Sequence, residues 1–322
     1  MIPGRREILP GTITGLINRG KLKIAFIHRE AIDTEKWDQV IAESPAETIY
    51  PYSWYLDAVA SNWSALVAGG YRFIMPVVWK KKAGMKYVYQ PFHTQQLGVF
   101  SHEYVEPQII REMLAIIYKK FRFAGINFNV KNLVGEEDPF TVDDKSNYIL
   151  ELNRDYDEHY KSFSSNAKRN IRQSAEFKEV VKKDVPVEEL VKLKKANDVI
   201  QRSEKDYARL QKLLETLIAR GEGSVYAIRT GTEVIAAAFF AHSRTRAIYM
   251  VSASGKTGME HRSMFRIVDA FIREYAGSGK ILDFEGSNIP SVARFFAGFG
   301  AQPEIYQGVS FSRLPATFNK LR

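Results

Sequence analysis

The chain has 322 residues, of which 45% are hydrophobic, and it contains no cysteine. This length predicts two domains with substantial cores, and the composition is typical of a soluble globular protein. The lack of cysteine excludes disulfides, thiolate metal sites and a cysteine nucleophile, and it fits the cytoplasmic location that we expect. The net charge of +9 favours an anionic partner such as a nucleic acid, a nucleotide, a phosphorylated lipid or a membrane surface, although an incidentally basic protein stays open as an alternative.

Neither a membrane span nor a leader is expected. No apolar run approaches the roughly 20 residues that cross a bilayer, and "VIAAAFFA" (234–241) has the length of a buried strand. Residues 1–21 include Arg5 and Arg6 but lack the apolar core of a secretory signal. We therefore expect residues 1–21 to form an N-terminal extension.

The first half of the chain predicts two helices, three strands, a helix and a strand, in that order. The helices at 34–44 and 52–62 come first. The strands at 64–70, 71–82 and 85–91 follow, then a helix at 106–121 with apolar residues on one stripe, and then a strand at 125–131.

The second half repeats this order. Helices at 186–200 and 203–221 precede strands at 223–231, 233–243 and 246–254, a helix at 263–277 and a strand from 280. Ser203 and Asp206 have the spacing of a capping box. The repeated order indicates an internal duplication, with the boundary in a polar loop at 138–147, ahead of a strand at 148–152.

Three motifs of the second half resemble the Fem family of peptidyltransferases, whose domains have the GNAT acyltransferase layout. They are "YKSFSSNAKRNIRQSAE" (160–176), "ILDFEGS" (281–287) and "VARFFAGFGAQPEIYQG" (292–308). The stretches "IYPYSWYLDAV" and "YQPFHTQQLGVFS" of the first half are similar to those of bacterial Fem relatives. The resemblance implies an α/β (α+β) fold of two tandem GNAT-like domains, 22–145 and 146–322, each with a mixed central sheet flanked by helices.

The same resemblance implies a function. It predicts acyl or aminoacyl transfer to an amine, on a peptidoglycan precursor, with aminoacyl-tRNA or acyl-CoA as the donor. Two features depart from the Fem pattern: the chain has no long helical insertion in its second half, and Phe296 stands where the family tends to place a catalytic lysine.

A basic helix at 161–176 is the first candidate binding element. Lys168, Arg169 and Arg172 project from one flank, and no acid lies between Ser164 and Arg172. Such a flank suits a phosphate or pyrophosphate group, because the planar arginine fork matches phosphate oxygens. A solvated helix face is the alternative interpretation.

Two carboxylates at the end of a strand are the candidate catalytic groups. Strand alternation places Asp283 and Glu285 on one face, at a position where α/β sheets favour ligands. A carboxylate there could deprotonate an attacking amine or hold it by a charge-assisted hydrogen bond. Alternatively, both acids are structural and pair with Arg262 or Arg294.

The residues after these carboxylates predict a turn into a helix. Gly286 permits a sharp exit from the strand, and Ser287 or Asn288 would cap a helix that begins near Pro290. We also count Ser287 among the candidate substrate ligands.

A glycine-containing loop at 254–264 lies where GNAT enzymes hold the pyrophosphate of coenzyme A. Gly255 and Gly258 have G-x-x-G spacing without the arginine that usually leads the GNAT pattern. Arg262 at the end of this loop remains a candidate ligand for an anionic donor. An ordinary turn between strand and helix is the alternative.

Aromatic and amide side chains of the first half predict an acceptor cleft between the domains. Tyr52 and Trp54 would form its walls, and Gln90, Gln95 and Gln96 would bind a peptide or sugar. The alternative is that the aromatic residues, Trp54 and Trp63 above all, are interface core. The histidines lack metal-ligand spacing, so we expect no metal, and no nucleic-acid-binding module is recognisable.

Three functions therefore compete. The first is Fem-like peptidyl or aminoacyl transfer, the second is acyl transfer from acyl-CoA by a GNAT enzyme, and the third is non-catalytic anion binding. In the first two, we expect Asp283, Glu285 and the cations at 168–172 to point into one groove between the two halves.

Overall fold

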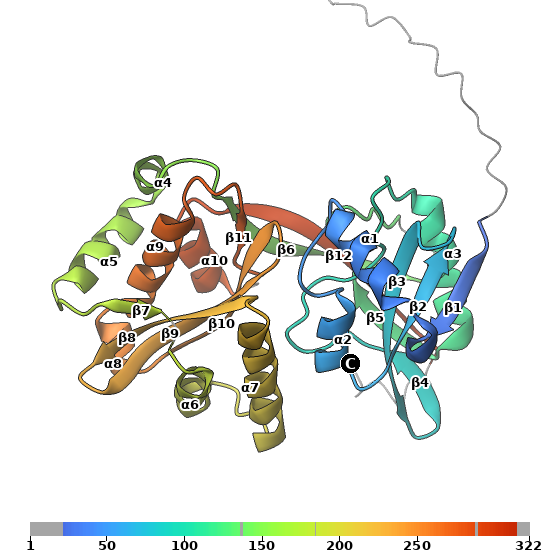
Figure 1. Cartoon of the computed structure of the whole chain (residues 1–322), viewed down its shortest axis with the longest axis horizontal. Helices are drawn as coiled ribbons and strands as arrows, with labels where there is room; N and C mark the ends of the chain where they lie inside the picture. The colour runs from blue at the N-terminus through green and yellow to red at the C-terminus, as the bar shows by residue number, and fades with distance from the viewer. Residues whose placement is uncertain (1–21, 136–137, 184, 287–288, 314–322) are drawn as a thin grey trace, which may run out of the picture.

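A single mixed sheet of twelve strands runs through the molecule (Figure 1). The computed structural model describes residues 22–135, 138–183, 185–286 and 289–313. The strand order is β1-β2-β3-β4-β5-β12-β6-β11-β10-β9-β8-β7, so the two halves of the chain lie side by side along one sheet. Residues 1–21, Ser287 and Asn288 lie outside the described residues, and so do our predictions for them.

The first half has five strands covered by helices. Its strands are β1 (Ile24–His28), β2 (Trp63–Ala68), β3 (Phe73–Lys82), β4 (Met85–Val88) and β5 (Phe123–Asn127). Its helices are η1 (Arg29–Ala31, a 3-10 turn), α1 (Thr34–Glu43), α2 (Ser53–Val59) and α3 (Pro107–Lys120).

The second half adds seven strands and seven helices within the described residues. Its strands are β6 (Thr141–Glu151), β7 (Val181–Lys183), β8 (Gly223–Thr230), β9 (Glu233–His242), β10 (Arg246–Ser254), β11 (Ile281–Asp283) and β12 (Gln302–Ser312). Its helices are α4 (Tyr156–Ser162), α5 (Ser165–Ala175), α6 (Val187–Asn197), α7 (Glu204–Ala219), α8 (Lys256–Glu260), α9 (Ser263–Tyr275) and α10 (Pro290–Ala297).

The repeated order of elements is confirmed. In the first half β2, β3, β4, α3 and β5 follow one another, and in the second half β8, β9, β10, α9 and β11 come in the same order, with the short helix α8 inserted before α9. The last pair of each set, β4 with β5 and β10 with β11, is parallel, whereas the other pairs within each set are antiparallel. In the second half, α6 and α7 cover one face of the sheet and α5, α9 and α10 lie on the other (Figure 1).

The sheets of the two halves are joined, which we did not expect. β12 pairs antiparallel with β5 through Gly308–Ser312 and with β6 through Gln302–Ser310. The stretch 138–147, predicted as a polar loop, is mostly strand β6, because β12 supplies hydrogen-bonding partners along its length. The last strand of the described residues, β12, therefore ties the first half to the second.

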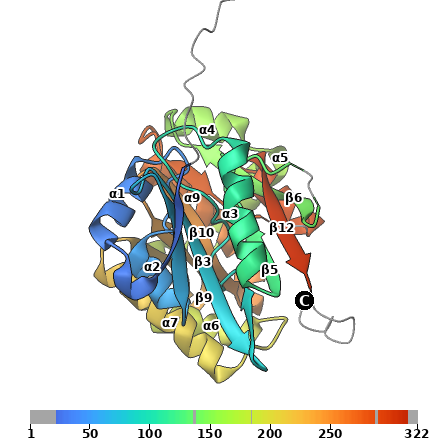
Figure 2. The ribbon, with the colours of Figure 1, turned by 90° about the vertical axis from the view of Figure 1, so that its right-hand side faces the viewer.

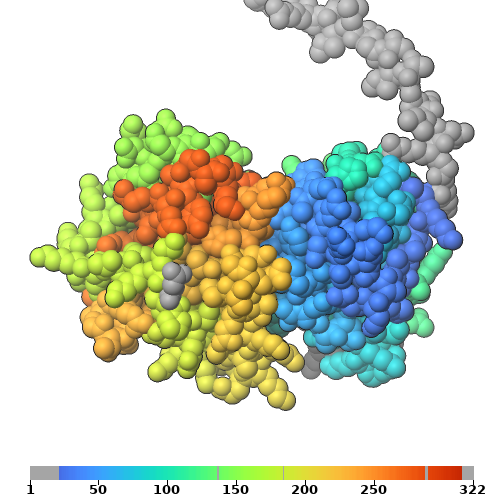
Figure 3. Space-filling view, viewed as in Figure 1, coloured from blue at the N-terminus to red at the C-terminus, as the bar shows by residue number. Residues whose placement is uncertain are grey.

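A buried carboxylate also fastens the two halves together. Glu47, 2% exposed, lies in the first half and accepts hydrogen bonds from the turn between β9 and β10. Its partners are the backbone N–H groups of Arg244 (3.2 Å) and Thr245 (3.1 Å) and the hydroxyls of Ser243 (3.0 Å) and Thr245 (2.7 Å). The space-filling view shows the two halves in contact over a broad front (Figure 3).

Glu47→Gln is expected to destabilise the fold by about 1–3 kcal/mol, because an amide accepts fewer hydrogen bonds and its NH2 group would face donors. Urea denaturation measures this loss. The exposed Glu43→Gln on α1 is the matched control and should change the free energy of unfolding little. Equal stability of the two variants would show that Glu47 does not fasten the halves.

Among the described residues, no helix has the length and apolar character needed to cross a membrane.

Candidate active site at the end of strand β11

Strands β10 and β11 pair along only three residues and then separate. Their parallel pairing ends at Ile248 and Asp283. A register shift between Tyr249 and Val251 marks an irregularity in β10 at the same place. Beyond it, β10 pairs with β9 on one side, and no described strand pairs with Tyr249–Ser254 on the other. The chain thus leaves an open strand edge inside the sheet.

A groove of about 800 Å3 follows this open edge. One wall is β10 itself, and helices α9 and α10 contribute apolar side chains, chiefly Phe265, Phe295 and Phe296. Residues 284–286 form the end at β11, and Lys194 and Asp198 at the end of α6 contribute polar groups. The groove therefore combines an apolar wall, an unpaired strand edge and, at its β11 end, the carboxyl group of Glu285.

Glu285 is held by a residue of the other half of the chain. The hydroxyl of Tyr50, in the connection between α1 and α2, donates a hydrogen bond to Glu285 Oε1. Glu285 has a φ of 56°, in the left-handed region that residues with a side chain rarely adopt. Such strain persists where the surroundings impose it, and it concentrates at functional sites.

The surroundings of Glu285 favour its neutral form. Burial, helped by the charge of Asp283, raises the pKa of this carboxyl to about 8, against the lowering effect of the Tyr50 hydrogen bond. Burial and the same two carboxylates raise the pKa of Tyr306 to about 12. A carboxyl with a pKa near neutrality can exchange protons with a bound substrate.

Asp283 has a structural partner that we did not predict. Its Oδ2 lies 2.7 Å from Arg246 Nη1, and the side chains are 2% and 9% exposed. Glu304 of β12 lies 3.4 Å from the same guanidinium nitrogen. The structural alternative named Arg262 or Arg294 as the partner of this acid, but the partner is Arg246, which opens the neighbouring strand β10 and lies beside β11.

Asp283 also supports Glu285 through the backbone. The Oδ1 atom of Asp283 accepts a hydrogen bond from the Glu285 N–H (2.9 Å). Gly286 follows, where a Cβ atom would lie 2.1 Å from the carbonyl oxygen of Ser146. The sharp exit predicted at Gly286 thus begins at Glu285, and the glycine is required by its close approach to β6.

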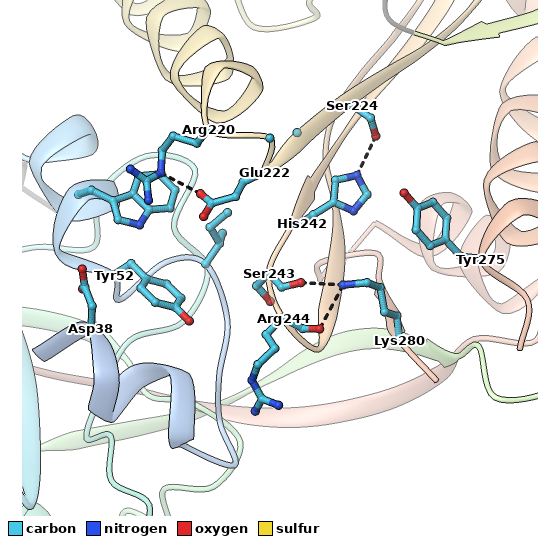
Figure 4. A pocket seen from close by; sticks show the side chains of 14 residues that line it. Asp38, Tyr52, Arg220, Glu222, Ser224, His242, Ser243, Arg244, Tyr275 and Lys280 are labelled. Atoms are coloured by element: carbon cyan, nitrogen blue, oxygen red, sulfur yellow. Dashed lines mark hydrogen bonds and ion pairs between the residues drawn. The ribbon is translucent and has the colours of Figure 1, made fainter. Parts of the chain in front are cut away.

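A second hollow lies between the two halves (Figure 4). It has a volume of about 670 Å3 and is lined from the first half by Asp38, Ile49, Tyr52 and Trp54. From the second half come residues 220–224, which lead into β8, residues 242–244 at the end of β9, and Tyr275 and Lys280. Ile49 and Tyr52 flank Tyr50 in sequence, so the tyrosine that reaches Glu285 belongs to the segment that lines this hollow.

Both cations and aromatic rings line the hollow. The guanidinium of Arg220 lies 4.0 Å from the ring centroid of Trp54. Lys280 Nζ donates to the carbonyl oxygens of Ser243 (2.8 Å) and Arg244 (3.1 Å), as Figure 4 shows. His242 Nε2 lies 2.8 Å from the Ser224 hydroxyl, and burial, with nearby lysines, lowers the pKa of His242 to about 4.

The predicted cations do not meet in one groove. Lys168, Arg169 and Arg172 lie on α5, and none of them lines the groove or the hollow. Lys168 Nζ donates to the carbonyl oxygen of Lys161 on the preceding helix α4 (2.8 Å), and Arg169 donates to Asn166 on its own helix (2.8 Å). Arg294 is exposed on α10 and also lies off both linings.

Arg262 does lie at the groove. It lines the groove from the start of α9, and its Nε donates to Gln173 of α5 (2.8 Å). The preceding Gly258 is explained by packing, since a Cβ atom there would lie 2.1 Å from the carbonyl oxygen of Ile235. Phe296 is buried in the groove wall, where its ring stacks on Phe284 with centroids 4.8 Å apart.

The acceptor residues predicted in the first half are divided between two environments. Tyr52 and Trp54 line the hollow, as expected of a cleft wall, whereas Trp63 is core. The glutamines instead bond within the protein: Gln90 to the carbonyl oxygen of Thr94 (2.9 Å), Gln95 to Asn147 (3.3 Å) and Gln96 to Gln95 (2.8 Å).

Among the described residues, no cluster of three or more histidine or acidic side chains could hold a metal ion.

Sequence reasoning missed Tyr50, Arg246 and Glu304. Arg246 carries a usable signal, because it is a charged residue at the start of an otherwise apolar strand. Tyr50 lies 235 residues from Glu285, and no local pattern connects the two.

Known proteins are similar to this chain in structure only. No family model matches it, and no curated protein does. The crystal structure of FemX has a TM-score of 0.63 at 11% identity, covering 88% of this chain and 96% of that one. A tandem GNAT protein from the clavulanic acid biosynthesis pathway has a TM-score of 0.56 at 11% identity, covering 91% of this chain and 100% of that one. The L-PGS from Bacillus licheniformis has a TM-score of 0.51 at 11% identity, covering 88% and 93%.

These similarities establish the fold. The chain has the mixed α/β architecture that FemX and the tandem GNAT protein share, as its sequence motifs predicted.

Proposed function

We propose that the protein transfers an acyl or aminoacyl group to an amine, with Glu285 as the general base. The observation that carries this proposal is a single carboxyl group of raised pKa at the end of a groove with an open strand edge. The groove and the carboxyl have complementary roles. The open strand edge can bind an extended donor, and the carboxylate can accept a proton.

The reaction proceeds by attack of the amine nitrogen on the donor carbonyl carbon. As the C–N bond forms, the ionised Glu285 accepts a proton from that nitrogen. When the bond to the leaving group breaks, the leaving sulfur or oxygen atom takes a proton, which Glu285 can return. Tyr50 orients the carboxyl and stabilises its charged form through its hydrogen bond.

We assign the donor to the groove and the acceptor to the hollow between the halves. Backbone groups of Tyr249–Ser254 would pair with amides of a pantetheine or aminoacyl arm, and Arg262 would meet donor phosphates. In the hollow, Trp54, Tyr52 and the neighbouring cations suit a polar, anionic acceptor such as a nucleotide-linked cell-wall precursor. Such a precursor is present in the bacterial cytoplasm, so this proposal includes a bacterial origin and a cytoplasmic location for the protein.

A GNAT reaction with acyl-CoA is the second candidate. The open edge beside a parallel strand pair supports it equally well. Phe296 in the groove wall, where the Fem family tends to have lysine, means that a Fem-like reaction here would rely on Glu285 instead.

A binding screen distinguishes the candidates. Thermal shifts are measured with acetyl-CoA, longer acyl-CoAs, aminoacyl-tRNA and nucleotide-linked muropeptides. A shift with muropeptide supports the Fem-like reaction, and one with acyl-CoA alone supports the GNAT reaction. No shift with any of them, and no loss of the protein's cellular function in Glu285→Gln, would leave the non-catalytic alternative.

The reaction rate is expected to depend on the ionisation of Glu285. A general base works when deprotonated, so kcat/KM should rise about tenfold per pH unit below a midpoint near 8 and level off above it. Initial rates from pH 6 to 10 measure the midpoint. A rate that is flat across this range would contradict the role.

The substitution Tyr50→Phe tests whether the pH midpoint comes from Glu285 or from the acceptor amine. The test is needed because an α-amino group titrates in the same pH range. Loss of the hydrogen bond destabilises the carboxylate, so the midpoint should move upward by about one pH unit. Tyr55→Phe is the control, because that hydroxyl donates to the backbone carbonyl of His93. An unchanged midpoint in Tyr50→Phe would assign the titration to the substrate.

A further inference from the structure

One end of the molecule presents cations and exposed apolar side chains together. The hairpin between β3 and β4 and the helices α6 and α7 lie at this end in both orientations (Figures 1 and 2). We call this surface the basal face and define it by Lys81, Lys82, Lys86, Phe92, Val199 and Ile200.

The basal face is continuous across the two halves. The guanidinium of Arg202, in the connection between α6 and α7, lies 5.2 Å from the ring centroid of Phe92. Lys80 of β3 lines the same small hollow as Phe92 and Arg202. The hairpin, the Phe92 loop and the 198–203 connection therefore adjoin one another.

Its charge is positive and largely uncompensated. From Ala58 to His102 the chain has no acidic residue but five cations, of which four lie in the hairpin: Lys80, Lys81, Lys82 and Lys86. Among the described residues neither Lys81 nor Lys82 forms an ion pair. The acids of the 198–206 segment are already engaged, as in the pairs Lys194–Asp198 (3.0 Å) and Lys195–Glu204 (2.8 Å).

Its apolar residues are unusually open to solvent. Val199 is 99% exposed, Ile200 75% and Phe92 69%. Two adjacent aliphatic side chains at such exposure mark a surface that an apolar partner covers. A phosphate backbone would engage the lysines but would offer nothing to Val199 and Ile200.

We propose that the basal face docks on an anionic lipid bilayer. The hairpin lysines face lipid phosphates, while Phe92, Val199 and Ile200 enter the boundary between headgroups and acyl chains. Val199 also lines the groove, so docking places the groove mouth at the bilayer. If the proposed transferase function holds, one of its two substrates is carried by a lipid; the docking itself does not depend on that function.

Vesicle sedimentation of the full chain tests the proposal. The vesicles are phosphatidylcholine alone, or phosphatidylcholine with about one third phosphatidylglycerol. Binding is expected only to the anionic vesicles and should weaken with added salt. Lys81→Glu/Lys82→Glu should lower the partition coefficient at least about 25-fold, and Val199→Ser/Ile200→Ser about tenfold.

A control with the same change of charge makes the test specific. Lys119→Glu/Lys182→Glu alters exposed lysines of α3 and β7 and should retain most of the binding. If this control lost as much vesicle binding, the effect would be due to net charge alone, and the proposed docking surface would be refuted. Absence of binding to anionic vesicles would also overturn the proposal. It would be overturned as well if gel shifts showed RNA binding that depends on Lys81 and Lys82 while vesicle binding does not. Vesicle binding without any transfer activity would sustain the docking while refuting the transferase.

Discussion

Glu285→Gln is expected to lower kcat/KM by about 10²–10⁴-fold, the usual contribution of a general base. The amide keeps the size of the carboxyl and can still accept the hydrogen bond from Tyr50, but it cannot take a proton from the amine. The measurement is the initial rate with the donor and acceptor that the binding screen identifies. Glu233→Gln, an exposed carboxylate on β9, is the matched control and should retain full activity.

The same substitution is expected to stabilise the protein. A carboxyl whose pKa is raised on folding contributes most stability below its unfolded pKa, and that contribution is lost as the pH rises through about 8. At pH 8 the variant should therefore unfold with a free energy on the order of 2 kcal/mol higher than the native protein, and the gap should narrow toward pH 5. Loss of both activity and stability would mean that Glu285 is a structural residue.

Asp283→Asn is expected to destabilise the fold by about 3 kcal/mol, because it leaves the guanidinium of Arg246 largely unpaired in a buried position. The weaker contact with Glu304, at 3.4 Å, keeps the loss toward the lower end of the range for broken buried pairs. Chemical denaturation at pH 7 measures the change.

Two further variants test the origin of this loss. Asp143→Asn on the exposed side of β6 has the same chemistry and should change stability little. Arg246→Met/Asp283→Asn removes the stranded cation and should recover part of the loss. A double variant that is less stable than Asp283→Asn alone would contradict the ion-pair explanation.

The repeated elements of the two halves could be predicted because their signals are local. The hairpins of β2–β3 and β8–β9 follow from apolar runs around turn residues, and Ser203 with Asp206 forms the capping box that the spacing predicted. The division at residue 145 stays a prediction.

Strand β12 was missed because its sequence, "QPEIYQGVSFS", mixes proline, glycine and polar residues. Its conformation is imposed by neighbours on both sides, β5 and β6, which no window of sequence contains. The β6 stretch was misjudged for the same reason.

The site was predicted in part. The strand-end pattern singled out Asp283 and Glu285; Glu285 and Arg262 line the groove, and Asp283 does not. The pattern could not separate their environments: Asp283 has a cation beside it, whereas Glu285 has a tyrosine from the other half. Those differences arise from tertiary contacts, which the strand-end pattern does not contain.

The return of β12 to the first half bears on how the polypeptide matures. A ribosome releases β5 long before residues 302–312, so the edge of β5 stays uncovered while most of the second half is made. An uncovered edge invites pairing with other chains, and the first half reaches its native form only when the last strand arrives. The N-terminal half therefore completes its sheet only after β12 has been synthesised.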